Sequence, residues 1–182
     1  IINSMGDKAQ AKCTMRNAGV PVIPGSNSLL SSPSEALKLA EEVVYPVMLK
    51  ATAGGGGKGI RKVENRDEME KLYTAAQTEA ITSFGNGDLY LEKFIEKPRH
   101  IEIQIIGDTH GNVAHLGERE CSIQRRHQKL VEESPSAVVD EELRKRMGDA
   151  AIHGAKKIGY IGVGTIEFIL DSNKDFFFME MN

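Results

Sequence analysis

From residue 46 to residue 63 the sequence reads Pro-Val-Met-Leu-Lys-Ala-Thr-Ala-Gly-Gly-Gly-Gly-Lys-Gly-Ile-Arg-Lys-Val. It opens with an apolar run short enough to be a buried strand, and residues 60–63 are expected to be the strand that returns beside it. Glycine has no Cβ, so the backbone N–H groups of Gly54 to Gly57 can approach an anion closely and form a nest around it. Lys50 at the base and Lys58 at the tip would add positive charge. We interpret the segment as a flap over nucleotide phosphates.

Other glycine-rich motifs fit this segment less well. A flexible linker is the simplest alternative, but linkers rarely lie between two apolar strands with a lysine in the first. A Walker P-loop is excluded because no Gly-Lys-Ser/Thr sequence and no helical pattern follow, and a dinucleotide-binding fingerprint is excluded for the same reason. By itself the segment therefore predicts only phosphate binding.

The composition is that of an ordinary soluble protein. Of 182 residues, 40% are hydrophobic and 27% are charged. The net charge of −3 gives no reason to expect nucleic acid or an acidic membrane as a partner. No apolar run is long enough to span a bilayer, and no signal peptide is recognised. Cys13 and Cys121 have no metal-binding spacing and are expected to be reduced thiols of a cytoplasmic protein. The chain begins without methionine and stops within an apolar strand pattern, so we expect a piece of a longer protein.

Capping residues and hydrophobic periodicity predict alternating helices and strands. Helices are expected before Gly19, after the capping box Ser32-Pro-Ser-Glu35, after the cap Asn65, and between the cap Asp140 and Gly159. Further strands are expected at 88–95, 99–107 and 112–120, with 121–133 as a long polar loop. The strand 99–107 alternates strictly, with Ile101, Ile103 and Ile105 on one face and His100, Glu102 and Gln104 on the other.

The last hairpin has the clearest geometry. Strands are expected at 164–170 and 176–182, and a four-residue loop between them puts Glu167 directly opposite Glu180. Like charges that face each other in this way are destabilising, and Asn182 points to the same face. Two carboxylates and an amide oxygen suit Mg²⁺, which takes oxygen ligands. A chance pair of surface glutamates is the alternative.

A series of motifs occurs in a characteristic order. They are Met5-Gly-Asp-Lys8, Lys50 with the glycine flap, Glu92-Lys-Phe-Ile95, Arg99-His-Ile-Glu-Ile-Gln104, Glu118-Arg-Glu-Cys-Ser-Ile-Gln-Arg-Arg-His-Gln-Lys129, Gly164-Thr-Ile-Glu-Phe168 and Glu180-Met-Asn182. Together they resemble the ATP-grasp part of biotin carboxylases over essentially the whole chain. The block Gln124 to Lys129 is the most specific. The Glu-Met-Asn ending is more typical of the acetyl-CoA or propionyl-CoA carboxylase type than of the pyruvate type.

The resemblance implies an α+β ATP-grasp fold, in which two α+β lobes hold a nucleotide between them, incomplete at both ends. Residues 1–21 would be a linker helix, 22–94 the lid lobe with the flap, and 95–182 the first part of the C-terminal lobe. The implied enzyme is a ligase that carboxylates biotin on the biotin carboxyl carrier protein, using ATP and bicarbonate by way of carboxyphosphate. That reaction is the first half of the acetyl-CoA carboxylase reaction in fatty-acid synthesis, and the carboxyltransferase would be a further partner.

The resemblance also implies a role for each matching residue. Lys129 would be catalytic, helping to bind bicarbonate. The ATP-binding residues would be Lys8 and Lys50 at the phosphates, Gly55, Gly56 and Gly57 closing over them, Glu92, Lys93, Phe94 and Ile95 at the adenine, and His100, Gln124 and His127 at the ribose and phosphates. The ligands of Mg²⁺ or Mn²⁺ would be Glu167, Glu180 and Asn182.

Some segments of the family pattern are missing. The family continues past Glu-Met-Asn with the arginine and glutamate that serve bicarbonate, and it has a domain before residue 1, so the 182 residues alone are expected not to carboxylate biotin. Alternatives are the corresponding domain of a pyruvate or propionyl-CoA carboxylase, another ATP-grasp ligase such as half of a carbamoyl-phosphate synthase, and a non-catalytic nucleotide-binding module. Cys121 could form a thiol–amine pair with Lys129, although a small buried cysteine is the simpler interpretation.

Overall fold

The computed structural model of the chain describes residues 8–53, 59–125 and 128–182. It divides into two compact units, one formed by Ile23–Ile95 and the other by Ile1–Val22 together with Glu96–Asn182. Each unit has its own sheet and its own hydrophobic core. Within the described ranges, no helix is both long enough and apolar enough to cross a membrane.

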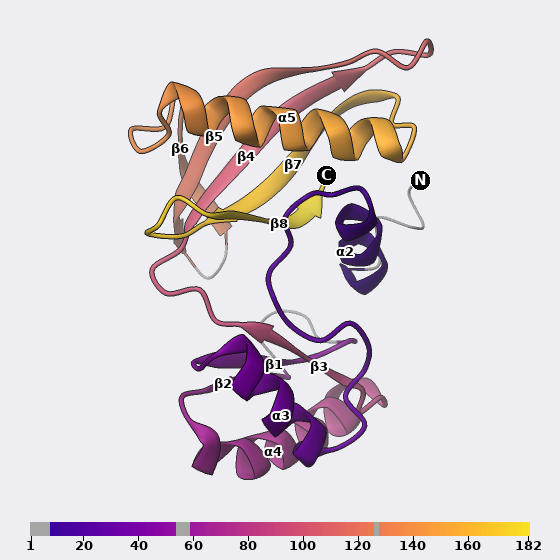
Figure 1. Ribbon diagram of the computed structural model, residues 1–182, viewed down its shortest axis with the longest axis vertical. Helices are drawn as coiled ribbons and strands as arrows, with labels where there is room; N and C mark the ends of the chain where they lie inside the picture. The colour runs from indigo at the N-terminus through magenta and orange to yellow at the C-terminus, as the bar shows by residue number, and fades with distance from the viewer. Residues whose placement is uncertain (1–7, 54–58, 126–127) are drawn as a thin grey trace. The chain divides into compact units, whose positions relative to one another are not determined.

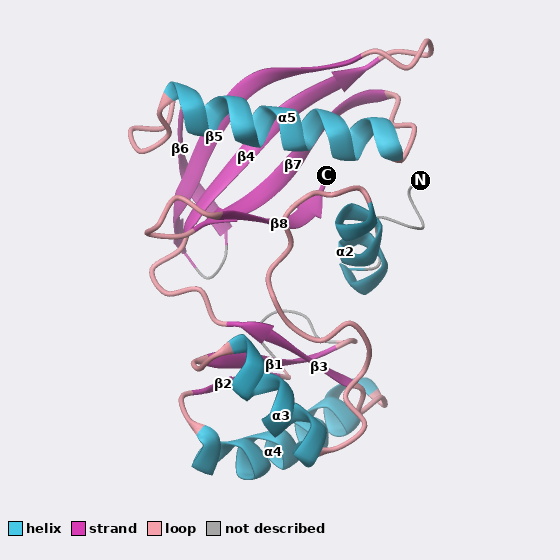
Figure 2. Ribbon diagram, in the orientation of Figure 1, coloured by secondary structure: helices cyan, strands magenta, loops and turns pink. Residues whose placement is uncertain are grey.

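The unit Ile23–Ile95 is built on a three-stranded antiparallel sheet with the strand order β2-β1-β3 (Figure 2). Its elements are α3 (Pro33–Val43), β1 (Val47–Ala51), β2 (Ile60–Val63), the short 3₁₀ turn η1 (Arg66–Glu68), α4 (Met69–Phe84) and β3 (Leu89–Lys93). Strand β1 buries alternate residues, Val47, Leu49 and Ala51, against the helices. This period of two leaves Lys50 on the other face of the sheet.

The larger unit is built on a five-stranded antiparallel sheet with the order β6-β5-β4-β7-β8. Its elements are α2 (Lys8–Asn17), β4 (Arg99–Gly107), β5 (Val113–Arg125), β6 (Gln128–Glu133), α5 (Glu141–Lys157), β7 (Gly162–Leu170) and β8 (Phe176–Met181). Helix α5 lies across one face of the sheet (Figure 1), where its Leu143 and Met147 share a core with the isoleucines of β4. His100, Glu102 and Gln104 alternate with those isoleucines and so belong to the opposite face.

The predicted helix caps are confirmed, with one difference. The Ser32 hydroxyl accepts a hydrogen bond from the Glu35 N–H at 3.2 Å, and the Asp140 carboxylate accepts one from the Leu143 N–H at 2.9 Å. Such caps contribute about 1 kcal/mol each because they satisfy N–H groups that lack a partner within the helix. Asn65 caps the short turn η1 rather than α4 itself.

The prediction of a polar loop at 121–133 is wrong. Strand β5 continues to Arg125, and β6 pairs with it from Gln128, so that Gln124 lies opposite Lys129. Strand β6 is an edge strand whose six residues are all exposed, so it has no buried face and no apolar alternation to reveal it. Backbone pairing with β5 forms this strand, and such pairing leaves no mark in the sequence.

The predicted pairing of Glu167 with Glu180 is confirmed, but the loop assumed for it is one residue too short. Leu170 pairs with Phe176, which makes the loop five residues long, and the Asp171 carboxylate closes it by accepting the N–H groups of Asn173 and Asp175. A bulge between Glu167 and Phe168 restores the expected register. The predicted loop was one residue too short and the bulge was not predicted. These two errors shift the register in opposite directions, so the glutamate pair was still predicted correctly.

Candidate functional site

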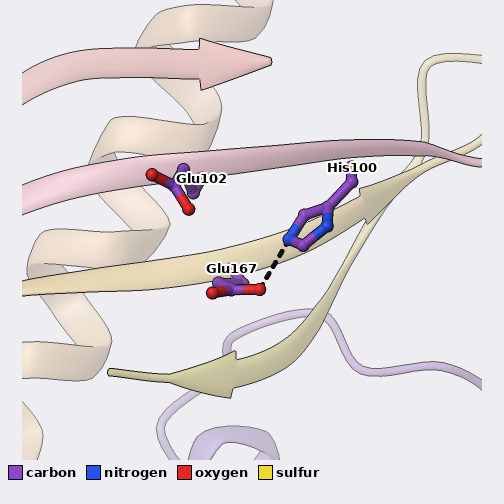
Figure 3. Close-up of side chains that lie close together, drawn as sticks. All are labelled: His100, Glu102 and Glu167. Atoms are coloured by element: carbon purple, nitrogen blue, oxygen red, sulfur yellow. Dashed lines mark ion pairs between the residues drawn. The ribbon is translucent and has the colours of Figure 1, made fainter. Parts of the chain in front are cut away.

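Three glutamates lie in a row across the face of the larger sheet that is opposite its isoleucine core. Glu102 of β4 pairs with Glu167 of β7, and Glu167 pairs in turn with Glu180 of β8. The side chains of Glu102 and Glu167 are 4% and 3% exposed. Figure 3 shows both of them with His100. Two buried carboxylates that face each other repel strongly unless a cation lies between them.

Lys129 supplies that cation. Its ammonium donates hydrogen bonds to Glu102 Oε2 and, at 3.0 Å, to Glu167 Oε1. Arg119 binds the other oxygen of Glu102 and donates to Gln104 Oε1 at 2.9 Å. Lysine and arginine thus bring positive charge to two buried carboxylates, which makes this face a balanced network instead of a row of like charges.

The network moves the pKa values of its members apart. Burial alone would raise the pKa of Glu167, but the nearby His100 and Lys129 lower it to about 2. Burial also opposes the hydrogen bonds from Lys129 and Arg119 at Glu102, and the net effect lowers the pKa of that carboxyl. The pKa of Lys129 is raised, because its bonds to the two carboxylates outweigh its partial burial. At neutral pH Lys129 is therefore a fixed cation, suited to holding an anion and unsuited to acting as a base.

His100 is oriented by two neighbours. Its Nδ1 lies 2.7 Å from the amide nitrogen of Gln124, which also donates to the Cys121 carbonyl at 2.7 Å. Since that nitrogen is the donor in both contacts, we assign Nδ1 as an acceptor and place the ring proton on Nε2. Nε2 lies 2.6 Å from Glu167 Oε2, although the ring is not turned for a well-aligned hydrogen bond.

The end of the hairpin offers an oxygen-rich donor set. Glu180 lies opposite Glu167, and the Asn182 amide nitrogen is 2.7 Å from Glu167 Oε1. Rotating this amide by half a turn would bring its oxygen to the same place. Two carboxylates and one amide supply the ligands that Mg²⁺ and Mn²⁺ take in proteins, so the residues fit such an ion.

Among the described residues, two groups of histidine, cysteine and glutamate side chains have ligand atoms close enough together to hold a metal. The ligand atoms of His100, Glu102 and Glu167 lie within 4.8 Å of one another (Figure 3), but the Lys129 ammonium already contacts both of these carboxylates. The second group joins Glu102 and Glu132 to Cys121. Burial and the Glu102 charge raise the pKa of this thiol to about 12, and a neutral thiol is a poor ligand. Neither group fits a metal as well as the hairpin does.

In the unit Ile23–Ile95, two of the residues predicted to bind ATP, Lys50 and Glu92, form an ion pair with each other. The Lys50 ammonium lies 2.6 Å from the Glu92 carboxylate, which is 8% exposed. The Lys93 ammonium donates to the Val44 and Tyr45 carbonyls at 2.7 and 3.1 Å, so it stabilises the turn after α3. That turn leads directly into β1.

At the end of β3, two backbone N–H groups already donate hydrogen bonds within the unit. The N–H groups of Lys93 and Phe94 donate to the carbonyls of Pro24 and Pro46. The Phe94 ring lies 4.3 Å from the Lys62 ammonium. Among the described residues none accepts a hydrogen bond from the Ile95 N–H. This donor is therefore the one in the segment 93–95 that a ligand could use.

The sequence matches one known protein family over almost its whole length. Residues 7–182 match the family model described as the ATP-binding domain of the carbamoyl-phosphate synthase L chain. The chain belongs to this ATP-binding family.

Within the family, the chain is similar to biotin carboxylases. It is 59% identical over 181 residues to the biotin carboxylase of Nostoc sp., a match that covers 100% of this chain and 40% of the relative. A crystal structure of the Campylobacter jejuni biotin carboxylase in complex with β,γ-ATP has a TM-score of 0.88 at 58% identity and covers 100% of this chain and 41% of that one. The Hydrogenobacter thermophilus 2-oxoglutarate carboxylase domain, solved with MgADP and bicarbonate, gives 0.87 at 53% identity over 100% and 40% of the two chains.

These similarities confirm the ATP-grasp fold and the resemblance to biotin carboxylases over the whole chain. The chain spans about 40% of the length of such relatives. Four of the residues expected to bind ATP in this family, Gly55, Gly56, Gly57 and His127, lie outside the described residues. Lys8 begins α2, but its side chain also lies outside what the structure describes.

Three residues of the polar network, Glu102, Gln104 and Arg119, had no role in the sequence-based expectation. Glu102 was part of a matched motif, and its place on the polar face of β4 was the available signal. Arg119 was also part of a matched motif, but its contact with Glu102 follows from the pairing of β4 with β5. Cys121 is fully buried with a raised pKa, which favours the interpretation as a small core residue over a reactive thiol–amine pair.

Proposed function

We propose that the chain is the central part of the ATP-dependent component of a biotin-dependent carboxylase. In the proposed reaction, a bicarbonate oxygen attacks the γ-phosphate of ATP, ADP leaves, and the carboxyphosphate formed breaks down to phosphate and CO₂. A deprotonated nitrogen of biotin, carried on the biotin carboxyl carrier protein, then captures the CO₂. The observation that carries the proposal is the fixed Lys129 cation beside Glu167 and its partner Glu180, in a chain 59% identical to a biotin carboxylase.

Each group in the larger unit has a proposed task. Glu167, Glu180 and Asn182 would hold Mg²⁺ or Mn²⁺, and the ion would neutralise charge on the phosphate oxygens. Lys129 would position bicarbonate, which its raised pKa supports because the ammonium keeps its charge. His100 and Gln124 would line the ribose and phosphates, and we expect His127 to join them.

The unit Ile23–Ile95 would supply the remaining nucleotide contacts. Lys50 would bind the phosphates, together with Lys8 and the three glycines Gly55, Gly56 and Gly57. The segment Glu92 to Ile95 would hold adenine, and the Ile95 N–H is its best available donor because the two preceding N–H groups are already used. We propose residues 22–94 as the lid lobe, 95–182 as the first part of the C-terminal lobe and 1–21 as a linker helix.

The acyl acceptor that we propose is acetyl-CoA, in cytoplasmic fatty-acid synthesis with a carboxyltransferase partner. Support comes from a relative named biotin carboxylase at 59% identity, against 53% for a 2-oxoglutarate carboxylase and 52% for a pyruvate carboxylase of Methanothermobacter thermautotrophicus. Other proteins named biotin carboxylase are 54% and 53% identical, and the biotin carboxylase subunit of a pyruvate carboxylase is 57% identical, so a pyruvate or 2-oxoglutarate type is the alternative.

Metal-dependent binding of ATP tests the proposed function. Calorimetric titration of the folded chain with ATP is expected to give binding in the presence of Mg²⁺ and none in EDTA, because the carboxylates of the hairpin repel the phosphates unless a cation lies between them. Circular dichroism recorded on the same sample checks the fold. Equal affinity in Mg²⁺ and in EDTA would contradict the metal site, and no binding by a folded sample would contradict the nucleotide site.

A further inference from the structure

Glu167 is already in contact with three nitrogen groups. Lys129 Nζ and Asn182 Nδ2 lie 3.0 and 2.7 Å from Oε1, and His100 Nε2 lies 2.6 Å from Oε2. The carboxylate is almost completely buried. A divalent cation bound to it would therefore lie close to an ammonium on the same group. Two cations at this separation repel strongly where the dielectric constant is low.

Of the three groups, Lys129 is the one that can withdraw. His100 is held on its other ring nitrogen by Gln124. Asn182 need not leave, because its amide can turn and present oxygen to the cation. Lys129 extends on a flexible four-carbon stem from the edge strand β6, and its side chain is 29% exposed.

Glu102 is placed to keep the lysine when it leaves Glu167. It lies directly opposite Glu167 on the neighbouring strand, so a short movement of the ammonium is enough. One of its oxygens is bound by Arg119 and the other faces Lys129. Arg119 is anchored in turn on Gln104, whose amide donates to the Gly164 carbonyl at 2.8 Å. The pair Glu102–Lys129 can therefore persist without Glu167.

We propose that Lys129 is a built-in competitor for the metal ion, so that a divalent cation binds Glu167 only as the ammonium withdraws to Glu102. The inference rests on the metal site of the proposed function and adds an order of events to it. Cation binding would release the ammonium donors from Glu167, and only then would they be available to an anionic substrate such as bicarbonate. Because such coupling is reciprocal, an anion held by Lys129 would in turn favour the cation.

Titration with Mn²⁺ alone, read from the electron paramagnetic resonance signal of the free ion, tests this competition. Lys129→Gln is expected to bind Mn²⁺ roughly tenfold more tightly than the unsubstituted chain, because the competing charge is gone. Glu102→Gln is expected to weaken binding, because the ammonium then depends on Glu167 alone. Lys145→Gln, which removes an exposed lysine on α5, is the matched control and should change nothing.

A double substitution separates competition from a simple loss of negative charge. If Glu102 acts through Lys129, Glu102→Gln has no effect in the Lys129→Gln background, whereas a direct charge effect would persist there. No gain in affinity on Lys129→Gln overturns the proposal. If Glu167→Gln abolishes Mn²⁺ binding while Lys129→Gln gives no gain, only the competition fails. If Glu167→Gln leaves Mn²⁺ binding unchanged, the metal site of the proposed function fails.

A second measurement needs no substitution and so does not depend on how the variants fold. Nitrogen-15 NMR of the lysine ammonium groups, recorded while Mg²⁺ is added, is expected to show a larger shift for Lys129 than for Lys145. An unchanged Lys129 signal at saturating Mg²⁺ would overturn the proposal.

Discussion

Glu167→Gln is expected to weaken Mg-ATP binding by on the order of 100-fold, with the fold retained. Glutamine keeps the size of the side chain and its oxygen acceptor, but it lacks the negative charge that would face the cation between Glu167 and Glu180. Lys129 keeps its other partner, Glu102, so no buried ammonium is left unpaired. Calorimetry gives the affinity, and thermal unfolding checks the fold.

The control for this substitution is Glu133→Gln, which removes an exposed glutamate from β6. It should leave Mg-ATP affinity within a factor of two or so of the original, because an exposed charge is screened by solvent. Similar losses for the two variants would mean that general charge matters and that Glu167 is not a ligand.

Arg144→Met is expected to destabilise the larger unit by about 3 kcal/mol at pH 7. The guanidinium binds both oxygens of Glu118, at 2.7 and 2.8 Å, and the Glu118 side chain is only 1% exposed. Methionine can fill much of the space but leaves a buried carboxylate whose remaining hydrogen bonds come from backbone N–H groups, among them that of Ser136 at 3.1 Å. The control is Lys145→Met at the next position. The ion pair of Lys145 with Asp149 is exposed, so its loss should lower the free energy of unfolding by less than about 0.5 kcal/mol.

The pH dependence of this loss has a definite sign. Burial raises the pKa of Glu118, but the hydrogen bonds from Arg144 and Ser136 lower it by a larger amount. The net shift of this pKa is therefore downward from 4.5. A lowered pKa in the folded state adds stability above the unfolded value, and that stability disappears as the pH falls through the folded value. Denaturant unfolding should therefore show a difference between Arg144→Met and the original chain that is full at pH 7 and shrinks below about pH 4.5. A difference that is independent of pH would contradict the ionic account.

The local parts of this structure could be predicted from the sequence. Ser32 and Asp140 cap the helices that follow them, and Glu167 pairs with Glu180 as expected, although the predicted loop was one residue too short and a bulge compensates for it. Caps depend on neighbouring residues, and strand alternation depends on a period of two, so both leave marks in the sequence.

The contacts that complete the candidate site could not be predicted in this way. Lys129 reaches Glu102 because an exposed edge strand, β6, pairs with β5, and bulges in β5 shift the register on both of its sides. Bulges and edge pairing depend on backbone hydrogen bonds between distant segments. The Lys50–Glu92 ion pair has the same origin, since it joins residues on the neighbouring strands β1 and β3.

The position of a bound metal ion is the most direct test of the central claim. Crystals of the chain grown with ADP and Mn²⁺ are expected to give an anomalous scattering peak among the oxygens of Glu167, Glu180 and Asn182, which form the all-oxygen donor set. A peak among His100, Glu102 and Glu167, or the absence of any peak beside Glu167 in crystals that contain ADP, would contradict the account.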